Sequence, residues 1–264
     1  MNNLKQILGL IFILLLPSIT LGQETTNTKP DKKWEFLIEP YLFFPYMNGT
    51  LGLGGVNDVS VDATPKDIFH QLKIGFMLNA EASKGNWHIN TDVIYMNLQQ
   101  DVTPSFFISK GNVTAKQLAW EVAGLYTLNR WLDVGAGVIL NSISVKPSLD
   151  IYNLDGSTSN FSNNFSQTWL DPMLIARTKN KEGSKVTYML RTDVGGFGIG
   201  AKFAYQIQSY IGYRFSDLFE VSGGYRWIGL DYKKNKTNDN LVDNNRFVYD
   251  MSITGPVIRA GFHF

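Results

Sequence analysis

The chain has no cysteine among its 264 residues. This absence excludes a disulfide framework, a cysteine-ligated zinc or iron–sulfur site and a thiol nucleophile. Charge is also scarce, because Asp, Glu, Lys and Arg make up 18% of the residues, against about a quarter in average soluble domains. The 24 basic and 23 acidic residues nearly cancel. A chain without a basic excess lacks the electrostatic footprint for nucleic acid, so we expect no nucleic-acid partner.

Long apolar runs are missing too, apart from one near the start. Residues 7–16 are almost all apolar, Lys5 precedes them, Pro17 follows, and small residues lead up to Gln23. A spanning helix needs about 20 apolar residues, so this run is too short for an anchor. We predict a secretory signal peptide over 1–22 and a polar leader over 23–33. A membrane-embedded chain without further apolar runs must span as a closed β-barrel.

Aromatic residues and strict alternation are what the chain has in abundance. Phe, Tyr and Trp number 17, 12 and 6. From residue 34 onward apolar and polar residues alternate; Trp87, Ile89, Val93 and Tyr95, for example, share a face opposite Asp92. A period of two predicts β-strands. The runs span roughly 10–14 residues, which exceeds the usual strand of about 5–6 and suffices for a tilted membrane-spanning strand.

We therefore predict an all-β fold for residues 34–264, a transmembrane antiparallel up-and-down β-barrel with aromatic side chains near both interfaces. A large soluble β-sandwich is the alternative. Short turns alternate with long polar connections, which we expect at 99–116, 146–167 and 233–245. Two short alternating pieces, 50–54 and 58–61, leave the strand number open. If they join the wall the barrel has 12 strands, the count we favour; if they form a separate hairpin it has 10. A short helix is expected near 65–72.

The final strand alternates up to the last residue. Ile258, Phe262 and Phe264 fall on one face, and Arg259 and His263 fall on the other. A terminal Phe on such a strand resembles the recognition signal of outer-membrane barrel assembly. We therefore expect the barrel-assembly machinery to be a partner and the three apolar residues to form its signal.

Short blocks throughout the mature chain carry a family resemblance. They are Glu39-Pro40-Tyr41-Leu42, Asn48-Gly49-Thr50, Asp67-Ile68, Thr91-Asp92-Val93-Ile94-Tyr95, Trp169-Leu170-Asp171-Pro172, the stretch 191–198, Gly224-Tyr225-Arg226 and Gly255-Pro256. These blocks resemble Gram-negative outer-membrane β-barrel proteins described as uncharacterised or porin-like. Similar proteins tend to carry an Arg where this chain has Gly137-Val138-Ile139. The resemblance implies the barrel fold and the bacterial outer membrane, but little about activity.

The charged residues sort by strand phase into two walls of the lumen. A Lys or Arg on the lipid face near the membrane midplane costs about 2–4 kcal/mol, so charges are expected inside. The first half of the chain supplies an acidic wall, and the second half a basic wall. The acidic wall is Glu39, Glu81, Asp92 and Glu121, and the basic wall is Arg177, Arg191, Arg214, Arg226 and Arg259.

Two interpretations of these walls remain open. The charges can pair across a narrow lumen as a structural network, or they can leave enough water to select small polar solutes. We expect a narrow porin-like channel for passive passage of small polar solutes. The alternative is a non-conducting structural or surface-interaction barrel.

An enzyme acting on lipid or peptide is less favoured, because the three histidines, His70, His88 and His263, accompany no nucleophile-elbow motif. We expect no catalytic residue, no metal site and no cofactor. The expected partners are outer-membrane lipid, lipopolysaccharide and small solutes. A cationic run beginning at Lys233 is one candidate contact with lipopolysaccharide phosphates.

Overall fold

The computed structural model describes residues 33–264 apart from 55–57, 103–107, 153–156, 181–182 and 235–245. The expected signal peptide and nearly all of the polar leader lie outside the described residues. The described chain is almost entirely strand. Its elements are β1 (Glu35–Phe43), β2 (Tyr46–Leu53), β3 (Val59–Ala63), α2 (Pro65–Gln71), β4 (Leu72–Lys84), β5 (Trp87–Asp101), β6 (Ile108–Asn129), β7 (Leu132–Tyr152), β8 (Thr158–Ser162), β9 (Phe165–Lys179), β10 (Val186–Gly195), β11 (Phe203–Arg214), β12 (Phe219–Lys234) and β13 (Phe247–His263).

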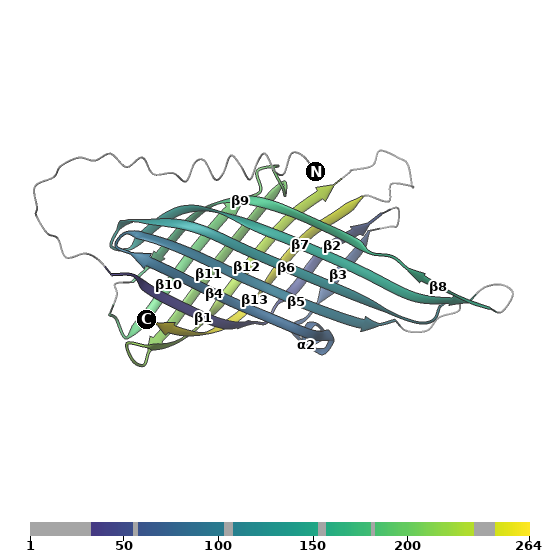
Figure 1. Ribbon diagram of the computed structural model, residues 1–264, viewed down its shortest axis with the longest axis horizontal. Helices are drawn as coiled ribbons and strands as arrows, with labels where there is room; N and C mark the ends of the chain where they lie inside the picture. Colours follow the sequence, from purple (N-terminus) through teal and green to yellow (C-terminus); the bar gives the residue numbers. More distant parts are fainter. Residues whose placement is uncertain (1–32, 55–57, 103–107, 153–156, 181–182, 235–245) are drawn as a thin grey trace, which may run out of the picture. The chain divides into compact units, whose positions relative to one another are not determined.

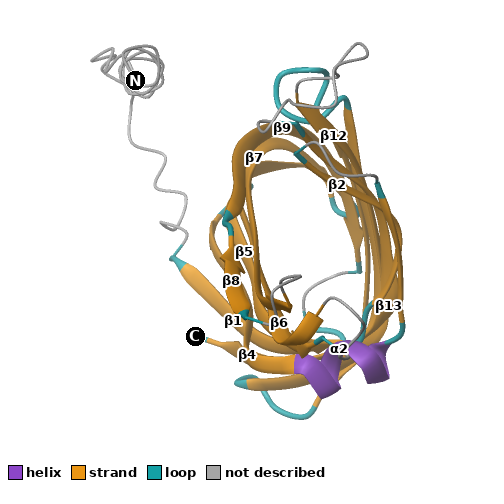
Figure 2. Cartoon of the chain, turned by 90° about the vertical axis from the view of Figure 1, so that its right-hand side faces the viewer, coloured by secondary structure: helices purple, strands orange, loops and turns teal. Residues whose placement is uncertain are grey.

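Ten of these strands close into an antiparallel barrel. The order is β1-β4-β5-β6-β7-β9-β10-β11-β12-β13, and β13 returns to pair with β1 from Leu37↔His263 to Phe43↔Val257. Figure 2 shows the resulting ring. Closure removes the free edges that an open sheet would expose, as a membrane-spanning sheet requires.

The favoured count of 12 wall strands is wrong, and the alternative of 10 is correct. β2 does not cross the wall independently, because it continues the course of β1 along the same partner: β1 pairs with the last part of β13 and β2 with its first part. Pro45, between them, cannot donate a ladder hydrogen bond, so the strand is interrupted there. β3 pairs with β2, and β8 pairs with β7; neither adds a wall strand.

Two of the expected long loops are largely strand. β6 and β7 run for 22 and 21 residues, about twice what crossing a bilayer requires. β7 then pairs with β8, so the hairpin extends as a tongue at the far right of Figure 1. All five residues of β8 are exposed. A strand that is surrounded by water can carry polar residues on both faces. The sequences of these segments therefore do not alternate between apolar and polar residues, and they resemble loops.

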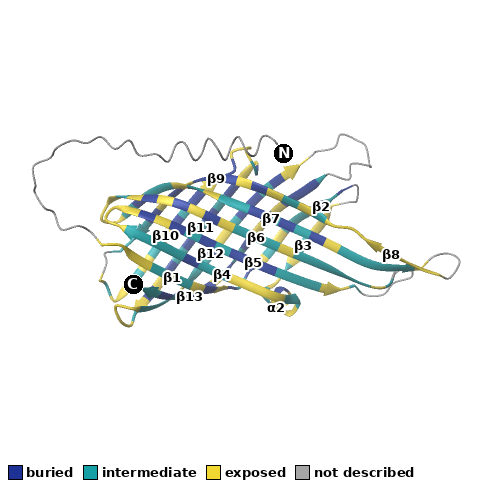
Figure 3. Ribbon diagram, in the orientation of Figure 1, coloured by how far each residue is buried: buried dark blue, intermediate teal, exposed yellow. Residues whose placement is uncertain are grey.

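The outer face of the barrel is apolar. Neighbouring residues separate sharply by phase: Leu174 is 59% exposed, whereas Ile175 is 4% exposed. Figure 3 shows this alternation as bands along the strands. The outward set includes Trp87, Trp120 and Ile211. Within the described part of the chain, no helix is both long enough and apolar enough to cross a membrane.

The expected short helix is α2, which joins β3 to β4. Its N-cap is Thr64, whose side chain and that of Asp67 form a reciprocal capping box, and Pro65 occupies the first turn. Proline suits this position because its missing N–H would be unpaired there in any case. α2 lies against the outside of the ring rather than within it (Figure 2).

Candidate functional site

The two ends of the barrel differ in their connections. The turn end carries the short connections after β4, β6, β9 and β11, together with Phe264, and the loop end carries those after β5, β7, β10 and β12. The lumen between them is the candidate site, because the inward faces of the strands bring together nearly all of the buried charges.

The sheet register places six of the nine expected charges in two continuous rows. Glu39, Asn79, Asp92 and Glu121 occupy directly paired positions on β1, β4, β5 and β6. Like charges at directly paired positions repel one another. The acidic row therefore needs an opposing charge from elsewhere in the barrel.

The opposing row lies on the second half of the barrel. Asp133, Arg177, Arg191, Gln208 and Arg226 occupy directly paired positions on β7, β9, β10, β11 and β12. Three arginines thus share one row, with Arg177 and Arg191 directly paired and Gln208 between Arg191 and Arg226. Because the sheet closes, this row faces the acidic one.

Each expected acidic residue pairs with one expected arginine. The pairs are Glu39–Arg259, Glu81–Arg177, Asp92–Arg226 and Glu121–Arg191. They join residues 96, 134, 70 or 220 positions apart in the sequence. The remaining arginine, Arg214, lies 3.6 Å from Glu220 on the neighbouring strand instead.

The middle of the lumen is a layer of fully satisfied charges, which we call the ion-pair layer (Asn90, Asp92, Glu121, Arg191, Asp193, Gln206, Arg226 and Tyr41). Arg191 donates to Asp193 and Asn90 at 2.9 Å each and to Glu121. Arg226 donates to the Tyr41 hydroxyl at 2.8 Å, and that hydroxyl donates to Asp92 at 2.7 Å. Gln206 connects the two arginine groups, since it accepts from Arg226 and donates to Asp193. Such charges are stable in a low-dielectric interior only when they are paired and hydrogen-bonded.

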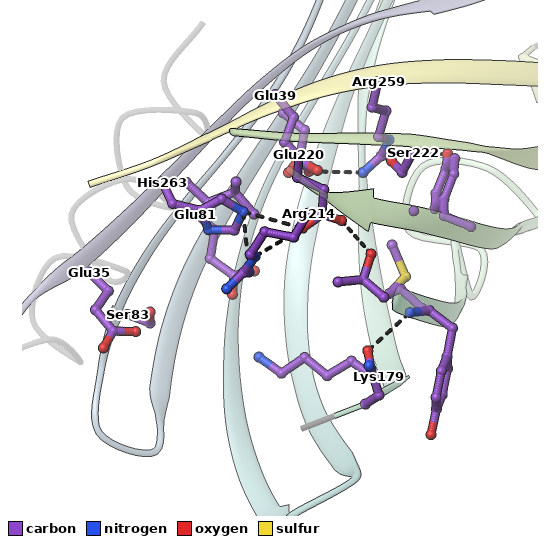
Figure 4. A pocket seen from close by; sticks show the side chains of 18 of the residues that line it. Glu35, Glu39, Glu81, Ser83, Lys179, Arg214, Glu220, Ser222, Arg259 and His263 are labelled. Carbon is purple, nitrogen blue, oxygen red and sulfur yellow. Dashed lines mark hydrogen bonds and ion pairs between the residues drawn. The ribbon is translucent and has the colours of Figure 1, made fainter. Parts of the chain in front are cut away.

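A cavity of about 610 Å³ lies on the turn-end side of the ion-pair layer. Figure 4 shows acidic and basic side chains projecting into it from several strands. Glu81 and Asp133 share Arg177, and Glu220 accepts from Thr187 at 2.5 Å and lies 3.3 Å from His263. We call this cavity the vestibule. Its charges of both signs suit water and small polar solutes.

The loop-end side of the lumen is apolar instead. Trp169 stacks on Tyr232 at 3.9 Å between ring centroids and contacts Phe247 and Tyr249. The inward side chains that surround this cluster are also apolar and buried. They include Phe43, Ile94, Met96, Ile143, Met173, Met251 and Ile253. A cavity of about 50 Å³ among these residues is large enough only for about one or two waters. We call this part of the lumen the apolar layer.

A buried carboxylate anchors one loop-end turn to the apolar layer. Asp171 accepts hydrogen bonds from Trp169 Nε1 at 2.9 Å, Asn141 at 3.0 Å and the backbone N–H of Ala201 at 2.5 Å. The turn contains Gly196 and Gly198 in the left-handed region, with φ of 83° and 75°, which glycine adopts without strain. Residues 196–202 thus form a turn that leads directly into β11 (Phe203–Arg214).

Sequence periodicity missed the apolar layer, because we expected a polar lumen throughout. A signal was present: residues 172–176 of β9 are apolar on both faces, whereas a strand between lipid and water alternates. Periodicity also missed the roles of Tyr41, Gln206 and Asp133 as hydrogen-bonding partners of the arginines. Of the expected assembly signal, Ile258 and Phe262 lie on β13 and Phe264 directly follows it; Ile258 and Phe264 are exposed.

One histidine has contacts that resemble a catalytic relay. His88 lies 3.0 Å from Glu81 and 2.9 Å from the Thr127 hydroxyl. The Thr127 hydroxyl, however, donates its proton to Asp133 at 2.6 Å. His88 therefore lies against a lone pair of the hydroxyl oxygen and is not placed to remove that proton. The contacts connect β4, β5, β6 and β7 at the turn end. Among the described residues, no group of three His, Asp or Glu could hold a metal ion.

No family model and no curated protein matches the chain. Solved structures do match it. The Ralstonia pickettii toluene transporter TbuX has a TM-score of 0.41 at 12% identity, with 88% of this chain and 77% of that one covered. The Pseudomonas putida toluene transporter TodX has a TM-score of 0.39 at 9% identity, covering 89% and 91%. Ail, the attachment invasion locus protein of Yersinia pestis, has a TM-score of 0.37 at 10% identity, covering 88% and 98%.

These three proteins are Gram-negative outer-membrane β-barrels. The likeness is one of fold, and the residue roles above rest on the contacts of this chain alone.

Proposed function

We propose that this chain is a bacterial outer-membrane barrel with a closed lumen, serving a structural or surface-interaction role rather than acting as an open pore. Its turn end faces the periplasm and its tongue of β6, β7 and β8 faces outward. Its environment is outer-membrane lipid and lipopolysaccharide, which it reaches through the barrel-assembly machinery.

The ion-pair layer is the observation that carries the proposal. Its five charged residues, Asp92, Glu121, Arg191, Asp193 and Arg226, are each at most 2% exposed. An ion or polar solute entering from the vestibule would have to separate these pairs, and removing a buried partner costs about 3–5 kcal/mol. It would then meet the apolar layer, whose mainly apolar side chains replace little of its hydration shell. Barrels of 10 strands are also far narrower than open porins of 16–18 strands.

Conductance across a planar bilayer tests the proposal directly. The refolded protein, confirmed as a folded barrel by its shifted mobility on unheated gels, should give no current steps above background. Steady steps from the unmodified protein would contradict a closed lumen.

The vestibule favours a second candidate, a narrow channel for small polar solutes. Its volume of about 610 Å³ would admit such a solute up to the ion-pair layer, whose rearrangement would then complete the path. If the protein conducts, replacing Arg214 and Glu220 by Gln should change its ion selectivity. Lys84→Gln is the matched control, because Lys84 is exposed at the turn after β4, on the outer phase of its strand.

A further inference from the structure

The wall of the barrel contains one interruption in its backbone pairing. The register between β1 and β4 ends at Pro40↔Leu78, yet β1 continues to Phe43 and β4 begins at Leu72. Within the described ranges, residues 72–77 have a paired strand only on the β5 side. We call this interruption the seam.

At the seam, the thioether sulfur of Met77 takes the place of a backbone carbonyl acceptor from a neighbouring strand. The backbone N–H of Phe44 bonds to Pro256 on β13, so the next N–H back along the chain, that of Phe43, points to the other side. It meets the sulfur of Met77 at 3.3 Å. Sulfur is a weak acceptor, and its contact is a weaker tie than a ladder bond to a carbonyl oxygen.

Side chains, rather than backbone, close the seam. On the outside the Phe44 ring packs against Phe69 of α2 at 5.3 Å between centroids, and Ile68 of the same helix is buried. Exposed apolar side chains flank the seam, with Leu42 and Ile74 at 56% and 60% exposure. The seam therefore opens toward the acyl chains of the bilayer and not toward water.

The apolar layer lies directly behind the seam. Phe43 is a seam residue, and it also lines the cavity of about 50 Å³ together with Ile94, Met96 and Met173. Met96 and Met173 line this cavity, and Met47, Met77 and Met251 belong to the apolar interior or pack on it. Methionine has an unbranched, flexible side chain that repacks readily around a guest.

We propose that the seam is an entry and binding site for small uncharged apolar molecules dissolved in the membrane, which pass between Phe44, Phe69 and Met77 into the apolar layer. The bilayer supplies apolar solutes at this face, and the side chains of the seam itself are apolar. Most of the residues that line the cavity behind it are apolar, and the polar ones include Glu121, Gln206 and Arg226 of the ion-pair layer. The flexible methionines provide volume that the small cavity lacks. The ion-pair layer keeps water and ions from the other side of the same compartment.

Cysteine labelling tests this route, because the natural chain has no cysteine. Met96→Cys places one thiol in the apolar layer, and Ala123→Cys places a control thiol that is equally buried but outside both cavities. The full-length folded barrel in liposomes is treated with apolar N-phenylmaleimide or with a charged methanethiosulfonate. Met96→Cys should react with the apolar reagent at least about tenfold faster than the control, and with the charged reagent no faster than the control.

Two further variants tie the reaction to the seam. Phe69→Ala should raise the rate at Met96→Cys about threefold to tenfold, which is what one aromatic pair is worth. Phe36→Ala is the matched control, since Phe36 is also exposed but lies where β1 and β4 are paired, and it should leave the rate unchanged. If Met96→Cys does not fold, Met173→Cys places the thiol in the same layer from β9.

Several results would overturn the proposal. Labelling by the charged reagent would show a water path, and labelling by neither reagent would show a sealed layer. An unchanged rate in Phe69→Ala would show that the route lies elsewhere. Labelling in detergent micelles that stops in liposomes would show that a lipid acyl chain occupies the seam.

Discussion

The two halves of the lumen are built from the same strands and yet are closed by different forces. β9 contributes Arg177 to the turn-end half and Trp169 to the loop-end half, and β12 contributes Glu220 and Tyr232 in the same way. The turn-end half has paired charges around a cavity of about 610 Å³, and the loop-end half has packed aromatic and methionine side chains around about 50 Å³.

This difference shows that a strand of a small barrel has no single inner chemistry. Where the strands approach the ion-pair layer, closure depends on each charge having a partner. Where they approach the loops, closure depends on packed volume. Substitutions in the turn-end half should therefore destabilise the barrel by leaving charges unpaired. Substitutions in the loop-end half should destabilise it by removing packed volume.

The largest expected effect comes from breaking the ion-pair layer. Arg191→Met leaves Glu121 and Asp193 buried without their cation, which should lower the free energy of unfolding by about 3–5 kcal/mol. Urea titration of the barrel in detergent micelles measures this loss. Arg214→Met is the matched control, because Arg214 is 23% exposed at 3.6 Å from Glu220 and should cost less than about 1 kcal/mol. Equal losses in the two variants would mean that the layer is not the dominant ionic contact.

A similar or slightly smaller loss is expected in the apolar layer. Trp169→Ala removes the stack on Tyr232 and the hydrogen bond to Asp171, and truncating a buried Trp costs about 3–5 kcal/mol. The loss of unfolding free energy in Trp169→Ala should not depend on salt concentration, because Trp169 carries no charge. The loss in Arg191→Met should depend on it. Trp131→Ala serves as the control, since Trp131 is exposed at a turn. A barrel of unchanged stability would mean that the layer packs without Trp169.

Much of this comparison could be predicted from the sequence, for a physical reason. Alternation with a period of two tells which residues share a face, and lipid tolerates charge so poorly that the charged face must be the inner one. Glu39, Glu81, Asp92 and Glu121 were therefore identifiable as a set, and so were the arginines. Which acid meets which arginine was not identifiable, because it depends on the register of all ten strands and on how the ring closes.

The remaining differences have equally local causes. The hairpin of β2 and β3 resembled two wall strands because its alternation is as regular as that of the wall; only the pairing of β2 with the first part of β13 excludes it. The apolar layer departs from alternation only over short stretches such as 172–176. The seam leaves no periodic signal, since it results from one strand pair that separates beyond Pro40.

A charge on the outer face should cost somewhat less than these interior losses. Leu174→Lys places an ammonium on the lipid side of β9, where a bilayer midplane position costs about 2–4 kcal/mol. The loss should appear in liposomes and shrink in short-chain detergent, where water reaches the side chain. Ser166→Lys is the control, because Ser166 has the same phase on β9 near the loop end. A loss of equal size in detergent and in liposomes would mean that Leu174 packs against protein rather than lipid.

The smallest expected effect is confined to α2, which covers the seam. Asp67 accepts two hydrogen bonds from Thr64, at 3.0 Å and 2.6 Å, and these hold the pKa of Asp67 below its ordinary value of 3.8. Because the folded carboxyl has the lower pKa, its contribution is complete above the ordinary value and is lost as pH falls through the lowered one. Acid should therefore fray α2 and leave β11 unchanged, as amide exchange of the two segments would report after correction for intrinsic rates. Thr64→Ala should raise exchange in α2 about fivefold at neutral pH, the factor that a lost N-cap is worth. It should also reduce the acid step, since Asp67 then keeps only the hydrogen bond from the backbone N–H of residue 64. An acid step of undiminished size in Thr64→Ala would assign the fraying to another group.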